Sequence, residues 1–103
     1  MSASMLKLPV RLRLDDASAV WAGLSASLRA EAAQVRSAAG AEVQINAAEL
    51  QQFDSAALSV LLCAARLCLS EGVTLQVKQV PSKLQELARV YGVGELLWPE
   101  LIR

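Results

Sequence analysis

The stretch of this chain that most restricts its possible folds is an almost continuous apolar helix predicted at residues 56–69. Between Ala56 and Leu69 the only polar side chains are Ser59 and Arg66. A helix that is apolar all the way round has to be covered by other parts of the protein. The run is shorter than the roughly 20 residues needed to cross a bilayer, so we expect no direct insertion into a membrane.

Strand and helix patterns alternate on both sides of this helix. Apolar and polar residues alternate at 6–14, 43–46 and 73–78, which predicts three strands. Pro9 lacks an amide hydrogen, so the first strand is expected to lie at an edge or to begin irregularly. Apolar residues at helical spacing predict further helices at 20–35 and 84–91.

The order strand, helix, strand, helix, strand, helix predicts an α/β fold with a mainly parallel sheet. The alternating strands favour helices packed mainly on one face, because a sheet covered on both faces would have continuously apolar strands. No linker or repeat divides the chain, so we expect a single domain over residues 1–103. Six strand residues are predicted to be buried: Leu12, Val43, Ile45, Val73, Leu75 and Val77. Four of their neighbours are predicted to be exposed: Arg11, Arg13, Gln44 and Gln76.

Residues with known end-of-helix preferences stand at the predicted helix boundaries. Asp15 and Asp16 are candidate caps of the first helix, and Gly72 is a candidate carboxy-terminal cap of the central one. Ser82 and Gln85 fit the S-x-x-Q form of a capping box at the start of the last helix.

Two apolar stripes run along the central helix. The first is assigned to the core and comprises Leu58, Leu61, Leu62, Ala65 and Leu69. The second comprises Ala56, Val60, Cys63 and Leu67, with Ser59 beside it. This second stripe has two interpretations that remain open: packing against neighbouring helices, or a surface that binds a partner protein.

Composition excludes several classes of function. Ten basic and ten acidic residues cancel, without a long run of either sign, which argues against nucleic-acid binding. The amino-terminal segment carries charges within its apolar stretch, unlike a signal peptide, so we expect a cytoplasmic location. Histidine is absent, and Cys63 and Cys68 match no redox or zinc spacing, so no catalytic residue, metal site or cofactor is predicted.

An Asp-Ser pair opens the central helix, and it also has two interpretations. Asp54 is a good cap, and Ser55 in the first turn could do no more than satisfy a backbone amide. Alternatively, a phosphate on the Ser55 hydroxyl would be stabilised by the helix amino end and would repel an acidic or apolar partner surface. Ser55 is therefore a candidate switch.

The segment "FDSAALSVLL" after the strand "VQIN" resembles the signature of STAS domains, the fold of anti-sigma-factor antagonists. The ending "PSKLQELARVYGVGELL", Pro81 to Leu97, resembles more specifically the small STAS subunits of Mla phospholipid transporters. Ala57 stands where the family pattern has glycine, and the first strand of the family's amino-terminal hairpin is short or missing. By this resemblance, Ser55 matches the position that is phosphorylated or contacts a partner, and Asp54 matches the acidic residue beside it.

The resemblance implies a non-catalytic accessory subunit of a bacterial ABC-type phospholipid transporter, which binds the cytoplasmic ATPase and lies at the inner face of the inner membrane through it. The alternative is an anti-sigma-factor antagonist that binds a serine kinase and is released when Ser55 is phosphorylated. The residues predicted to contact the partner are Phe53, Asp54, Ser55, Ala56, Ser59, Val60, Cys63 and Leu67.

Overall fold

The computed structural model describes residues 5–35 and 41–93, with three helices and five short strands in this part of the chain. In chain order the elements are β1 (Met5–Lys7), β2 (Arg11–Leu12), α1 (Ala17–Val35), β3 (Glu42–Asn46), β4 (Gln52–Phe53), α2 (Ala56–Ser70), β5 (Thr74–Lys78) and α3 (Ser82–Val90).

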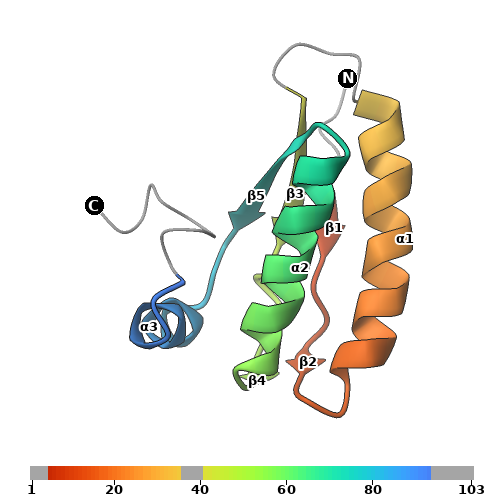
Figure 1. The fold of residues 1–103 in the computed structure, drawn as a ribbon. Coiled ribbons are helices and arrows are strands. Elements are labelled where there is room, and N and C mark those ends of the chain that lie inside the picture. The colour runs from red at the N-terminus through yellow and green to blue at the C-terminus, as the bar shows by residue number, and fades with distance from the viewer. Residues whose placement is uncertain (1–4, 36–40, 94–103) are drawn as a thin grey trace.

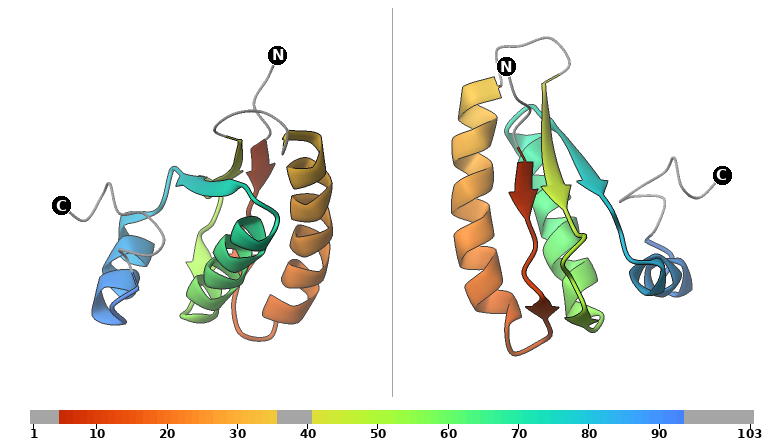
Figure 2. Two further views of the ribbon diagram at one scale, coloured as in Figure 1. Left: turned by 45° about the horizontal axis from the view of Figure 1, so that its top comes forward. Right: turned by 180° about the vertical axis from the view of Figure 1, so that it is seen from behind.

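A three-stranded parallel sheet forms the centre of the fold, in the order β1-β3-β5. The register pairs Leu6 with Ile45 and Ile45 with Val77, so these apolar side chains lie on the same face. Figures 1 and 2 show α1 and α2 side by side on one face of this sheet, while α3 lies beyond the end of β5. The predicted α/β fold with a mainly parallel sheet and helices on one face is confirmed.

The first predicted strand is divided into two. Pro9 lies between β1 and β2, and β2 pairs with β4 in a separate parallel ladder. The carbonyl oxygen of Val10 accepts hydrogen bonds from the amides of Gln51 and Gln52, at 2.8 and 2.9 Å. These hydrogen bonds join the segment before α1 to the segment before α2. Both helices therefore begin at the same end of the molecule (Figure 1).

The core lies between the sheet and the two helices that cover it. Leu12, Leu28, Ile45 and Leu61 are among its fully buried side chains. Of the six strand residues predicted to be buried, five are buried, and Leu75 on the edge strand β5 is half-buried. Arg11 and Arg13 are exposed as predicted. Gln44 and Gln76 are half-buried, because they are paired neighbours on the face that no described helix covers.

The buried side of α2 differs from the predicted core stripe. Leu58 and Leu61 are buried as expected, but Leu69 is 78% exposed, which corrects its assignment to the core. The buried residues of the helix are Ala56, Ala57, Leu58, Val60, Leu61, Ala64 and Cys68. With about 100° of rotation per residue, these side chains share an arc of about 200°, and Leu69 lies outside it.

Glycine ends two helices, but the predicted capping box does not form. Gly72 has a φ of 78°, and the amide of Val73 donates to the carbonyl of Cys68 at 2.9 Å, as in a Schellman motif. At the start of α3 the cap position is Pro81, without a side-chain hydrogen bond. Gln85 donates instead to the carbonyl oxygen of Val80, at 3.1 Å, since the helix begins one residue earlier than the pattern predicts.

Candidate partner-binding surface

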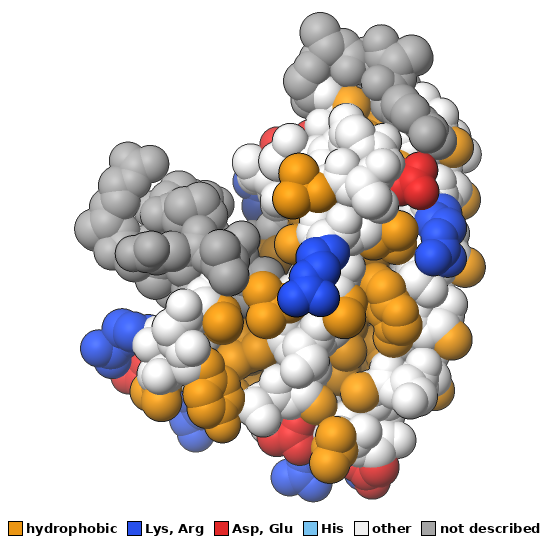
Figure 3. All heavy atoms as spheres, viewed as in Figure 1, with side chains coloured by type: hydrophobic (Ala, Val, Ile, Leu, Met, Phe, Trp, Pro, Cys, Tyr) orange, Lys and Arg blue, Asp and Glu red, His pale blue; other side chains and the backbone are white. Residues whose placement is uncertain are grey.

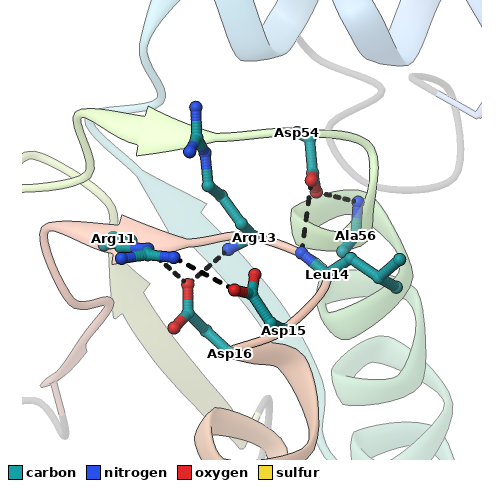
Figure 4. A network of polar contacts seen from close by, with 7 residues as sticks. All are labelled: Arg11, Arg13, Leu14, Asp15, Asp16, Asp54 and Ala56. Carbon is teal, nitrogen blue, oxygen red and sulfur yellow. Dashed lines mark hydrogen bonds and ion pairs between the residues drawn. The ribbon is translucent and has the colours of Figure 1, made fainter.

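The start of α2 is held by the carboxylate of Asp54, which accepts two backbone hydrogen bonds (Figure 4). One oxygen accepts from the amide of Ala56 at 2.9 Å and thereby caps the helix, as predicted. The other accepts from the amide of Leu14 at 3.2 Å, in the turn between β2 and α1. A single side chain therefore fixes the position of this turn relative to the start of α2.

Ser55 follows Asp54 in a helical conformation, with φ of −62° and ψ of −17°. Its side chain is exposed and makes no capping hydrogen bond. The backbone carbonyl accepts from the amide of Leu58 at 3.0 Å, so the residue is fixed by the helix and not by its hydroxyl. Asp54 does the capping, and the Ser55 hydroxyl is open to an incoming molecule.

The turn beside α2 has its own polar network, also drawn in Figure 4. Arg11 forms ion pairs with Asp15 at 3.2 Å and Asp16 at 3.0 Å, and Asp16 also accepts from the amide of Arg13 at 3.0 Å. The carboxylate of Asp16 thus binds back to the turn, where the sequence had suggested a cap for α1. These contacts hold Leu14 at the surface, where its side chain is 77% exposed.

On the other side of Ser55, a groove of about 550 Å³ separates the start of α2 from α3. Phe53, Asp54 and Ser55 line one side of it. The α3 side is lined by Lys83, Glu86, Leu87, Val90 and Tyr91. Figure 3 shows hydrophobic side chains on both sides of the hollow between these helices. Val90 and Tyr91 are 74% and 57% exposed, an unusual share for large apolar side chains next to each other.

The structure divides the residues predicted to contact a partner. Ala56 and Val60 are only 8% and 4% exposed and belong to the interior, which corrects the expectation that a partner could reach them. For these two residues the second apolar stripe packs inside the domain. The accessible members are Phe53, Asp54, Ser55, Ser59, Cys63 and Leu67, of which Ser55, Ser59 and Cys63 are the most exposed. Their contact with a partner stays a prediction.

The sequence patterns did not indicate that Leu14, Leu87, Val90 or Tyr91 belong to this surface. Exposed apolar residues at the end of an amphipathic helix give no local signal of their exposure. Only the position of α3 relative to α2 reveals that Val90 and Tyr91 face the same groove as Ser55.

The described residues offer no arrangement for metal binding, because no group of three or more His, Cys, Asp or Glu side chains is placed to hold an ion. Burial raises the pKa of the Cys68 thiol, and the nearby charge of Glu71 adds to this shift. Cys68 is therefore held as a neutral thiol in the core, while Cys63 is exposed on α2.

The fold agrees with a comparison against family models. The model described as "Mlab, STAS domain" matches residues 2–101, nearly the whole chain. The chain belongs to the STAS domain family. Within that family it is of the MlaB type, and STAS domains of this kind are generally non-catalytic accessory or regulatory proteins. No curated protein matches the chain.

In this STAS domain the Asp-Ser pair lies at the start of α2, where the resemblance placed it, and its hydroxyl faces outward. None of the helices in the described ranges has the length and apolar character required to cross a bilayer.

Proposed function

We propose that this STAS domain is a non-catalytic accessory subunit of a bacterial ABC-type phospholipid transporter. It binds the cytoplasmic ATPase subunit and supports the assembly or the activity of that ATPase. The observation that carries the proposal is the match of the MlaB-type family model to residues 2–101. The ATPase would hold the domain at the cytoplasmic face of the inner membrane.

The geometry around Ser55 supports binding of a protein. Val90 and Tyr91, at the carboxy-terminal end of α3, are exposed and line the same groove as Ser55. Leu14 is exposed on the turn that Asp54 binds. Charged side chains, Lys83 and Glu86, lie at the groove as well. An apolar patch with a polar rim is typical of surfaces that lose water on binding another protein. The Ser55 hydroxyl would then be one polar contact within this patch.

A second function, an anti-sigma-factor antagonist, is favoured by one feature of the same site. The Ser55 hydroxyl is exposed, makes no capping hydrogen bond and stands at the amino end of a helix, where a phosphate is stabilised. A serine kinase could therefore reach it. Phosphorylation would place a double charge among the apolar side chains of the surface and release a bound partner.

Binding to purified proteins separates the two functions. The phospholipid-transporter ATPase and an anti-sigma serine kinase from the same cell would each be titrated with the wild-type domain. We expect the ATPase to bind, Ser55→Ala to be mild, and Ser55→Glu to weaken binding at least about tenfold, because a charge would enter a dehydrated contact. Ser27→Glu, on the exposed side of α1, is the matched control and should bind as wild type.

Stoichiometric binding of the kinase in place of the ATPase would reject the transporter proposal. So would a phosphate on Ser55 in protein from growing cells, detected by mass spectrometry, if the phosphorylated form releases the kinase. Equal binding of the ATPase by wild type and Ser55→Glu would place its contact elsewhere on the domain.

A further inference from the structure

The exposed side of α2 continues from Ser55 to the other end of the helix. Successive residues of a helix are rotated by about 100°, so residues eleven apart differ by only about 20°. Arg66 therefore lies almost in line with Ser55. The exposed residues from Ser55 onward share an arc of about 120°: Ser55, Ser59, Cys63, Arg66, Leu69 and Ser70. We call this set the α2 ridge.

Arg66 is the only charged residue in the fifteen residues of α2. Its side chain is exposed and forms no ion pair or hydrogen bond with any residue in the described ranges. One basic group stands over α2 in Figure 3, and the side chains around it are hydrophobic or neutral. None of the ion pairs in the described ranges includes Arg66.

Leu69 lies one turn beyond Arg66 on the ridge. At 78% exposed it is the most exposed of the large apolar side chains in the described ranges. Arg66 and Leu69 are three residues apart on one helix, so the same partner can cover both side chains. Covering the arginine without a counter-charge would be unfavourable, since its guanidinium would lose water and gain no hydrogen bonds. A partner on this part of the ridge has to provide an acid.

The distance from Ser55 is short enough for one partner to contact both. Eleven residues of helix extend about 16 Å. A standard interface covers about 800 Å² on each protein, which corresponds to a disc of roughly 16 Å radius. Leu69, fourteen residues from Ser55, lies about 21 Å from it. An interface of this size centred midway along α2 therefore covers Ser55, Arg66 and Leu69.

We propose that the same ATPase binds the ridge through a second contact, in which one of its carboxylates pairs with Arg66 beside apolar surface that packs on Leu69. The inference rests on the proposed function and specifies the chemistry of the partner. Arginine suits this role because its planar guanidinium can donate two parallel hydrogen bonds to one carboxylate. The pair fixes the orientation of the ATPase along α2, while the surface near Ser55 provides the first contact.

The test measures the dissociation constant of the purified ATPase for four variants of the domain. Arg66→Glu should weaken binding at least about tenfold, because an attraction becomes a repulsion. Arg66→Lys keeps the charge but loses the two parallel hydrogen bonds, so its affinity should lie between those of Arg66→Glu and wild type. Leu69→Ser should weaken binding about threefold to tenfold through lost apolar contact. Arg29→Glu reverses an exposed charge on α1 and should leave binding unchanged. All three side chains are exposed, so the melting temperature of each of the four variants should match wild type.

Charge reversal on the ATPase identifies the acid. Exposed Asp and Glu residues of the ATPase would be changed to Lys one at a time, and one of them should restore binding to Arg66→Glu. Wild-type affinity in Arg66→Glu, together with weak binding of Ser55→Glu, would overturn this inference and leave the proposed function intact. A wild-type domain that fails to bind the ATPase would overturn both.

Discussion

Removing the carboxylate of Asp54 should destabilise the domain much more than removing an acid nearby. Asp54→Ala deletes both acceptors of the two backbone hydrogen bonds at the start of α2. Loss of a helix cap costs about 0.5–2 kcal/mol. The bond to the amide of Leu14 contributes about 0.5–1.5 kcal/mol more. We therefore expect the free energy of unfolding to fall by about 1–3.5 kcal/mol.

Two comparison variants separate these contributions. Asp54→Asn keeps one acceptor oxygen, so only one of the two amides stays bound, and it should lose about half as much stability as Asp54→Ala. Asp15→Ala removes an exposed ion pair with Arg11 and should cost no more than about 1 kcal/mol, as is usual for surface pairs.

The assay is urea denaturation followed by circular dichroism, with the melting temperature as a second measurement. For a domain of this size, each kcal/mol corresponds to about 4–8 °C in the melting temperature. In hydrogen exchange followed by NMR, the amide of Leu14 should lose protection in Asp54→Ala and keep it in Asp15→Ala. A loss of stability in Asp54→Ala no larger than that in Asp15→Ala would refute the assignment of Asp54 as the link between the two segments.

Further predictions concern the interior of α2. Leu61→Ala should lower the free energy of unfolding by about 2–5 kcal/mol in urea titrations, since the side chain is fully buried. Val60→Asp should unfold the isolated domain as judged by circular dichroism, whereas Cys63→Asp, at an exposed position of the same helix, should leave the melting temperature nearly unchanged. A folded Val60→Asp domain would contradict the burial of that residue. A thiol reagent should modify Cys63 in the native protein and Cys68 only in denaturant, because burial excludes the reagent and raises the pKa of the Cys68 thiol.

Sequence periodicity was sufficient to predict the main sheet and the helices that cover it. Each of these elements has several apolar residues at a regular spacing, and β3 and β5 lie where the alternation placed them. The ladder between β2 and β4 was not predicted, since each of these strands has only two residues. Two residues are too few to show an alternating pattern. The pairing of β2 with β4 also depends on the direction that the chain takes after β1, at Pro9.

Which side of α2 faces the core was harder to predict, because the helix is apolar on nearly every side. A polar face normally shows which residues point outward, but here only Ser59 and Arg66 gave that information. Leu69 was therefore assigned to the core, although it lies close to Arg66 in rotation around the axis. Val60 was left open between core and surface for the same reason.

The candidate site was predictable at its centre and not at its edges. Residue type and position identified Asp54 as a cap and Ser55 as its neighbour in the first turn. The second hydrogen bond of Asp54 joins residues 40 positions apart in the sequence, and no local pattern encodes such a contact. The groove beside Ser55 likewise depends on the placement of α3, which a single sequence does not provide.

The parallel sheet also constrains how the chain can fold as it is synthesised. Among the described residues, β1 pairs with β3, and β3 pairs on its other side with β5, so a complete helix separates each strand from its next partner. Such pairings close long loops and form slowly compared with local contacts. On the ribosome, β1 and α1 would wait for β3 to emerge, and one edge of β3 would stay open until α2 and β5 had followed. During that interval the part of α2 that packs against β5 would be exposed to solvent and to chaperones.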